Sequence, residues 1–219
     1  MTELTIPLRG EPFRLLPEHA IFREMTGTLL VADPHFGKSA SFRAAGLAVP
    51  GGTTAGTLRR VDAALARTGA RRLVFLGDFF HARAGRVPAT LEALSAWRIL
   101  HPDLDVVLVR GNHDRHAGDL PPELRIRSVD EPLLEAPFAW CHHPEPVAGS
   151  YVLAGHLHPA MVLRGPARQR ERLPCFWFGA RVGVLPAIGE FTGTAEIRPA
   201  PDDGVYVVAG DNVLSVRPG

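Results

Sequence analysis

The sequence predicts an α/β fold with a partly parallel sheet, and three observations point to this class. In the first half of the chain, short apolar runs alternate with helical patterns, which implies right-handed crossovers between parallel strands. The second half consists of strand-like runs separated by short turns. The hydrophobic content is 46% and the charged content 21% of 219 residues, close to the globular average, so we expect a folded chain with a substantial core.

The first half contains three apolar runs of strand length and two amphipathic segments between them. The expected strands are residues 28–33, 72–78 and 106–112, and the expected helices are residues 53–69 and 88–101. Thr53 or Thr54 is suited to cap the start of the first helix, and Gly69 is suited to end it.

The second half predicts a series of short strands. They are expected at residues 125–130, 133–142, 151–156, 160–165, 175–188, 194–199 and 204–218. The last run is typical of a hairpin that turns around residues 210–212. No internal repeat or linker divides the chain, so the sequence predicts a single domain over residues 1–219.

Five of the expected strands end in side chains that can bind metal. The residues at these ends are Asp33, Asp78, Asn112, His142 and His156. In sheets of this class, ligands bind beyond the carboxyl ends of the strands, so we expect these side chains to converge.

Neighbouring histidines enlarge the set. His35 and His158 each follow a strand-end ligand by two residues, and histidine with carboxylate suits Mn²⁺, Fe or Zn²⁺. Seven ligands are too many for one tetrahedral ion and suit two ions that share a bridging carboxylate. Two ions ~3.5–4 Å apart lower the pKa of a bridging water and clamp a phosphate during in-line displacement. Gly77, Gly111 and Gly155 each precede a ligand, where a tight turn or close approach needs a missing Cβ.

The charged and aromatic residues do not identify the substrate. The net charge of +1 gives no bulk attraction to nucleic acid or membranes, so a local patch must supply it. The candidates are Arg164, Arg168, Arg170 and Arg172 in an expected loop at residues 164–174, and Lys38, Arg43, Arg83 and Arg86 near the first motifs. An ordinary solvated loop is the alternative for the arginines. Bases stacking on Phe36, Phe42, Phe79 and Phe80 compete with a role for these rings in the core.

The compartment is indicated by what the chain lacks. Cys141 and Cys175 are too few for a disulfide framework, so we expect reduced thiols in a cytoplasmic protein. The first residues carry charges and prolines where a signal peptide needs an apolar stretch. No apolar run approaches the ~20 residues that span a bilayer, which predicts no membrane association.

The order of the motifs D-x-H, G-D, G-N-H-[DE], H and G-H-x-H resembles that of the calcineurin-like metallophosphoesterase superfamily. This resemblance implies a four-layer α-β-β-α sandwich of two mixed sheets with helices on the outer faces. Residues 29–61, residues 72–85 and the stretch "LPAIGEFTG" at 185–193 are similar to the bacterial ligase-associated DNA damage response endonucleases, the PdeM family.

The resemblance assigns roles to the motif residues. One ion would be held by Asp33, His35, Asp78 and His158, and the other by Asp78, Asn112, His142 and His156, with Mn²⁺ as the expected metal and Fe or Zn²⁺ also compatible. At "CHHP", the family pattern favours His142 over His143 as the ligand.

Three further residues are catalytic candidates. The family places His113 beside the scissile phosphate, where an imidazolium is suited to protonate a leaving group. Asp114 either orients His113 or caps a turn. His81 either reaches a substrate phosphate or caps a turn.

The resemblance implies a Mn²⁺-dependent phosphodiesterase that nicks single-stranded DNA in a repair pathway by attack of a metal-activated hydroxide on phosphorus. It also implies functional association with an ATP-dependent DNA ligase, a helicase and an exonuclease. A small-molecule phosphoesterase acting on cyclic nucleotides, nucleotide sugars or phosphoproteins shares the same ligands and is the alternative. A non-enzymatic scaffold is disfavoured because the ligands and His113 are all present. The oligomeric state is not indicated.

Overall fold

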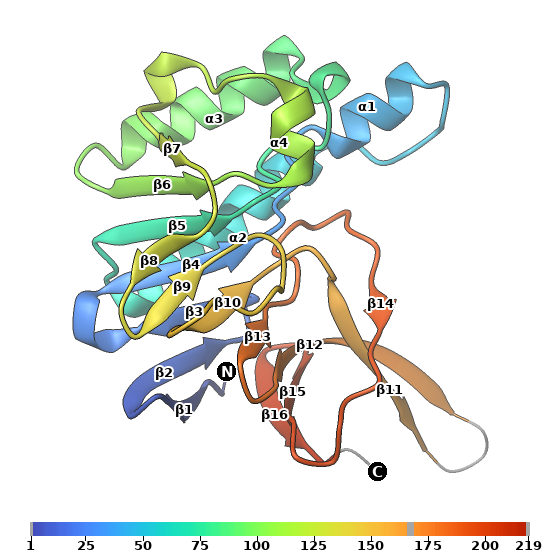
Figure 1. Cartoon of the computed structure of the whole chain (residues 1–219). Helices are drawn as coiled ribbons and strands as arrows, with labels where there is room; N and C mark the ends of the chain where they lie inside the picture. Colours follow the sequence, from blue (N-terminus) through green and yellow to red (C-terminus); the bar gives the residue numbers. More distant parts are fainter. Residues whose placement is uncertain (1, 166–168, 218–219) are drawn as a thin grey trace.

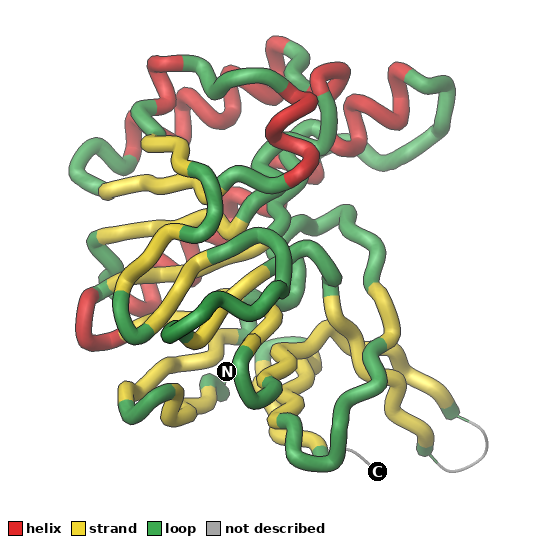
Figure 2. Tube along the Cα trace, in the orientation of Figure 1, coloured by secondary structure: helices red, strands yellow, loops and turns green. Residues whose placement is uncertain are grey.

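Two mixed β-sheets pack face to face in the computed structural model, which describes residues 2–165 and 169–217. The α-helices lie together on one side of the first sheet, and the second sheet lies on the other side (Figures 1 and 2). The α/β class with two mixed sheets is therefore confirmed.

The first sheet has the strand order β1 to β7 in sequence. Its strands are β1 (Leu4–Leu8), β2 (Glu11–Leu16), β3 (Ala20–Arg23), β4 (Thr28–Ala32), β5 (Arg72–Leu76), β6 (Asp105–Val109) and β7 (Arg127–Val129). The pairs from β1 to β4 are antiparallel, and the pairs from β4 to β7 are parallel. The expected parallel strands are therefore the centre of this sheet, and β1 to β3 extend it beyond the prediction.

The helices come from the connections of the parallel strands. They are α1 (Lys38–Ala44), α2 (Thr53–Thr68), α3 (Pro88–Leu100) and α4 (Asn112–Ala117), with short 3-10 turns at Glu24–Thr26, Arg83–Gly85 and Pro122–Leu124. Gly69 ends α2 in the left-handed conformation, as predicted. The predicted threonine cap is wrong: Gly52 precedes the helix, and the Thr53 hydroxyl instead lies 2.9 Å from Ser39 Oγ of α1.

The second sheet runs in the order β14-β11-β12-β13-β10-β9-β8, and β15 also pairs with β12 and carries β16 on its other side. Its strands are β8 (Leu133–Glu135), β9 (Phe138–Trp140), β10 (Tyr151–Ala154), β11 (Pro159–Arg164), β12 (Arg170–Phe178), β13 (Val182–Val184), β14 (Ala195–Glu196), β15 (Gly204–Ala209) and β16 (Asn212–Val216). β9, β10 and β13 are parallel neighbours. The terminal hairpin of β15 and β16 is present as predicted.

Alternate side chains of the central strands face two separate cores. On one face, Leu29 and Val31 of β4 pack with the buried residues of α2 and α3, among them Val61 and Trp97. On the other face, Leu30 and Ala32 join the core between the sheets, which includes Trp140, Leu153 and Phe176 of the second sheet. This strict alternation fixes the register of the strands, and thereby the position of the residues that follow them.

Two expectations need correction. Among the described residues, α-helices cover the outer face of the first sheet only, and the outer side of β9 and β10 is instead packed against Val147 of the connecting segment. The arginine segment at 164–174 is largely a hairpin, because Arg164 pairs with Arg170 and Val162 with Arg172 across β11 and β12. Arg168 lies outside the described residues.

Candidate metal centre

The segments that follow β4, β5, β6, β9 and β10 bring the predicted metal ligands together at one edge of the two sheets. Asp33 and His142 are fully buried, Asp78 is 2% exposed and His35 is 5% exposed. Buried carboxylates and imidazoles at such density need partners of opposite charge or a bound cation. The structure therefore concentrates metal-binding groups where the sequence predicted them.

One group of donors gathers around His35. Its Nε2 lies 3.3 Å from His158 Nε2 and 3.8 Å from Asp78 Oδ2. The His158 Nε2 atom is in turn 3.6 Å from Asp33 Oδ2. Asp33, His35 and His158 thus form one set whose ligand atoms all lie within 4.8 Å of one another.

A second group gathers around His142. Its Nε2 lies 2.9 Å from Asn112 Oδ1, 3.1 Å from His156 Nδ1 and 3.4 Å from Asp78 Oδ1. These four residues are the second set that the motifs predicted. Each comes from a different segment of the chain, so the fold alone assembles them.

Asp78 lies between the two groups. Its Oδ1 faces His142, and its Oδ2 faces His35. A carboxylate with one oxygen toward each group has the geometry required of a bridging ligand. Burial and the nearby Asp33 both raise the pKa of Asp78 above its ordinary value, because each disfavours a second negative charge at this place.

The backbone at the site is strained. Five of the seven predicted ligands have positive φ angles: Asp33 at 52°, His35 at 45°, Asp78 at 51°, His156 at 70° and His158 at 48°. Residues with side chains adopt this region rarely, and such strain concentrates at functional sites. These turns aim the side chains out of the strand direction and toward one another.

The three glycines noted in the motifs make room for ligand side chains. A Cβ at Gly77 would lie 2.1 Å from His142 Nδ1, and one at Gly111 would lie 2.3 Å from Asp78 Oδ1. At Gly155, a Cβ would be 2.6 Å from Asp33 Oδ2. The close approach predicted for these positions is therefore to the ligands themselves.

Backbone carbonyls orient two of the histidines, and no motif in the sequence indicates either contact. His142 Nδ1 donates to the carbonyl of Leu76 at 3.1 Å, and His158 Nδ1 donates to that of Gly193 at 3.0 Å. Each contact places the proton on Nδ1 and leaves the Nε2 lone pair directed at the centre. The stretch 185–193 thus supports the site through Gly193.

The donor set fits divalent cations. With its proton on Nδ1, His142 presents a lone pair at Nε2 toward Asn112 Oδ1, so two acceptors face each other at 2.9 Å. Asp33 Oδ1 is buried and has no hydrogen-bond partner among the described residues. Burial, followed by nearby positive groups, lowers the pKa of His35 to about 2, which keeps its imidazole neutral. Such unsatisfied acceptors are stabilised when cations lie among them.

His113 and His81 stand at the rim of the centre. His113 Nε2 lies 3.9 Å from Asp78 Oδ2, and its side chain is 36% exposed. Its Nδ1 donates to the carbonyl of His81 at 2.5 Å. The two rings stack with centroids 5.1 Å apart, and burial, followed by Lys38 and His113, lowers the pKa of His81 to about 4. His113 thus has a fixed orientation and an accessible Nε2.

The contacts of Asp114 are those of a turn cap. Its carboxylate accepts hydrogen bonds from the backbone amides of Gly111 and Phe79 at 2.9 Å each, and from that of Phe80 at 3.4 Å. Burial, despite these bonds, raises its pKa to about 6. Of the two roles left open for Asp114, the hydrogen bonds match the cap, since none joins it to the His113 ring.

The two histidines of "CHHP" differ in their surroundings. His142 is fully buried among the donors of the second group, whereas the His143 side chain is 31% exposed. His143 Nδ1 lies 2.6 Å from Glu131 Oε1, and Glu131 Oε2 accepts the backbone amides of His142 and His143 at 2.8 and 2.9 Å. Glu131 was not singled out from the sequence, because no motif contains it. The geometry favours His142 as the ligand.

The aromatic and basic candidates divide between core and surface. Phe36, Phe79 and Phe80 are at most 1% exposed and belong to the helix-side core, so a base-stacking role for them is wrong. Phe42 is only partly buried and lies outside the hydrophobic clusters. Arg86 packs over the Phe80 ring and donates to the carbonyl of Ala117, which is a structural role.

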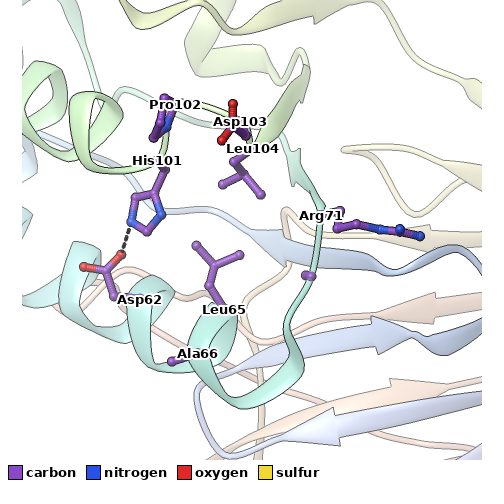
Figure 3. Close-up of a pocket in the computed structure, with 9 residues that line it drawn as sticks. Asp62, Leu65, Ala66, Arg71, His101, Pro102, Asp103 and Leu104 are labelled. Atoms are coloured by element: carbon purple, nitrogen blue, oxygen red, sulfur yellow. Dashed lines mark hydrogen bonds and ion pairs between the residues drawn. The ribbon is translucent and has the colours of Figure 1, made fainter.

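A hollow of about 670 Å³ lies apart from this centre (Figure 3). It is formed by the end of α2 and by the segments ahead of β5 and β6, with the His101 ring bonded to Asp62 at 2.9 Å. It therefore opens at the amino ends of strands whose carboxyl ends carry the metal-binding residues.

Comparison with known proteins identifies relatives of this chain. A family model described as Calcineurin-like phosphoesterase matches residues 28–156. The crystal structure of Pseudomonas putida nuclease MPE superposes with a TM-score of 0.87 and 46% sequence identity, covering 98% of this chain and 100% of that chain. Yfce, a phosphoesterase from E. coli, gives a TM-score of 0.42 at 14% identity, covering 88% of this chain and 99% of that one. Among curated proteins, no sequence matches.

Proposed function

Because this chain belongs to the calcineurin-like phosphoesterase family, we propose that it is a two-metal phosphodiesterase that nicks single-stranded DNA. The observation that carries the proposal is the placement of Asp78 between two complete donor groups. The 46% identity to a nuclease over almost the whole chain supports a polynucleotide substrate.

The residues would hold one ion between Asp33, His35, Asp78 and His158, and the other between Asp78, Asn112, His142 and His156. Mn²⁺ is the proposed metal, as the family resemblance implies, and the mixed imidazole and carboxylate donors also suit Fe or Zn²⁺. When bound, such a pair of ions lowers the pKa of a water between them and neutralises phosphate oxygens.

His113 is proposed to donate a proton to the departing alkoxide or a hydrogen bond to a phosphoryl oxygen. Its fixed Nδ1 contact with the His81 carbonyl leaves Nε2 as the group that faces the substrate. Asp114 would keep the start of α4, which carries His113, in place through the amides of Gly111, Phe79 and Phe80. His81, stacked on His113, would limit the movement of that ring and border the phosphate.

The proposed setting is DNA repair in the cytoplasm, in functional association with an ATP-dependent DNA ligase, a helicase and an exonuclease. Both cysteines are free and buried, as suits a compartment that keeps thiols reduced. Among the described residues, no helix has the length and apolar character to cross a bilayer.

The test is incubation of metal-stripped protein with circular single-stranded DNA and with a chromogenic phosphodiester, adding Mn²⁺, Mg²⁺ or Zn²⁺ in turn. We expect nicking of the circle with Mn²⁺, loss of this activity in Asp78→Asn, and full activity in the control Asp202→Asn, an exposed surface residue. A circle has no ends, so its cleavage identifies an endonuclease. Hydrolysis of the small diester with an intact circle would replace the proposal with a small-molecule phosphoesterase.

A further inference from the structure

Phe42 and Phe191 form an aromatic corner beside the metal centre. Phe42 lies on α1, Phe191 lies in the stretch 185–193, and both are partly exposed. Their ring centroids are 5.8 Å apart at an interplanar angle of 81°. Neither ring belongs to the hydrophobic clusters of the described residues, so packing of a core does not account for them.

This corner is connected to His113 by further rings. The Phe42 ring is 5.6 Å from that of His81, and His81 stacks on His113 at 5.1 Å. The side chains therefore form a row that leads from the surface to the histidine beside the proposed scissile phosphate.

The polypeptide around the corner is free of acidic residues over two long stretches. Residues 36–61 and 79–91 contain no Asp or Glu. The backbone ties the two stretches together, because the Phe36 amide donates to the Phe79 carbonyl at 2.8 Å and the His81 amide to the Phe36 carbonyl at 3.2 Å. Exposed Arg43 and Arg83 form no ion pair with any described residue, and Lys38 lies 5.9 Å above the Phe42 ring. This surface is complementary to a phosphate backbone.

The acidic side chain that is nearest to Phe191 in the sequence points away from the Phe42 ring. Glu190 precedes Phe191, but its carboxylate lies at Gly56 of α2, where a Cβ would be 1.6 Å from Glu190 Oε2. Its charge acts there on Arg60. The Phe191 ring lies instead against that of Phe42.

We propose that Phe42 and Phe191 bind, by stacking, a base of the strand adjoining the scissile phosphate. The inference rests on the proposed function and adds to it the origin of selectivity for single strands. In a duplex, bases are already stacked on one another and cannot enter the corner without unpairing. An unpaired base has a free face, and an aromatic ring accepts any of the four.

The experiment compares binding of two fluorescent oligonucleotides to the metal-stripped protein in EDTA. One is oligothymidine, and the other is an abasic strand of equal length and charge. We expect the protein to prefer the base-containing strand, and Phe191→Leu and Phe42→Leu to bind it roughly 5- to 100-fold more weakly. The affinity for the abasic strand should stay as it was, since Lys38, Arg43 and Arg83 remain.

Matched variants separate stacking from folding. Leu47→Ala removes an exposed apolar side chain near α1 (54% exposed) and should retain the preference. Phe191→Trp keeps a ring and should retain it as well, and melting temperatures check that each variant folds. Equal binding of both strands by the wild-type protein, or an unchanged preference in the leucine variants, would overturn the stacking proposal. Failure of the wild-type protein to nick circular DNA would instead overturn the proposed function.

Discussion

At the scale of single residues, the metal centre combines features that oppose folding. Asp33, His35, Asp78, His156 and His158 have φ angles between 45° and 70°, each costing about 1–3 kcal/mol. Asp33 and Asp78 are buried carboxylates close to each other. Glycine would relieve the backbone cost and neutral side chains would relieve the cost of the buried charges, so the ligands are explained by the cations they would hold rather than by stability.

Asp78→Asn should therefore stabilise the metal-free protein while removing its response to metal. Burial and Asp33 raise the Asp78 pKa, so its ionised form is unfavourable in the folded state at neutral pH. Asparagine removes the charge and still accepts the His113 amide, now 3.0 Å from Oδ1. In urea unfolding with EDTA, the free energy of unfolding of the variant should exceed that of the wild type by about 0.5–2 kcal/mol. In a parallel experiment without EDTA, Mn²⁺ should not raise the free energy of unfolding of the variant further. A less stable metal-free variant would contradict this account.

His19 lies away from the metal centre, and its protonation should make the protein less stable in acid. Burial, followed by Arg60, lowers its pKa from 6.5 to about 4, and its Nδ1 donates to the Ala187 carbonyl at 2.8 Å. The unfolded chain takes up the proton first as the pH falls below 6.5, so stability is present above this value and declines toward pH 4. The decline attributable to His19 is on the order of 2–3 kcal/mol.

The variant His19→Asn should lose less stability over the same pH interval, because asparagine does not titrate and tolerates the φ angle of 63°. Urea unfolding of both proteins in EDTA, from pH 7.5 to pH 4, measures the difference. If the free energy of unfolding fell equally with pH in both proteins, His19 would not contribute to the acid response.

Much of the site could be predicted because its residues follow recognisable strands. Asp33 follows β4 directly, and His142 and His156 each come two residues after a buried strand. The supports escaped prediction for a physical reason. The carbonyls of Leu76 and Gly193 have no side-chain signature, and Glu131 reaches the His142 amide from eleven residues away.

At the scale of elements, the parallel strands of the first sheet were predictable and its N-terminal antiparallel strands β1 to β3 were not. β4, β5 and β6 are apolar on both faces and stood out as runs. β1 is an edge strand of the first sheet, β2 lies between β1 and β3, and the pair carries Pro7 opposite Pro12. β12 begins in a charged segment at Arg170, where pairing with β11 overrides the loop-like composition.

The segment between β7 and β8 should influence metal affinity through Glu131. Its carboxylate accepts the amides of His142 and His143 and the His143 ring. Glu131→Gln replaces an acceptor by a donor at one of these contacts, so Mn²⁺ affinity should fall by about tenfold in a calorimetric titration. Glu145→Gln changes an exposed residue of the segment that follows β9 and carries His142; this control should bind Mn²⁺ as the wild type does. Equal affinities of all three proteins would show that Glu131 does not position His142.

At the scale of the whole molecule, we propose that the chain folds as one domain. The core between the sheets contains residues from both halves, including Val74 and Val107 of the first sheet and Trp140 and Phe176 of the second. Neither sheet can keep this core without the other, so unfolding should be cooperative. Calorimetry should show a single transition with equal calorimetric and van't Hoff enthalpies. Two separated transitions would contradict a single domain.

The central claim is that one buried carboxylate joins two metal sites, and Mn²⁺ electron paramagnetic resonance tests it most directly. Metal-stripped protein titrated with Mn²⁺ should bind two ions per chain and show the spectrum of a magnetically coupled pair, as expected for ions ~3.5–4 Å apart. Asp78→Asn should abolish the coupled signal. A single ion per chain, or two ions that show no magnetic interaction in the wild-type protein, would contradict the account.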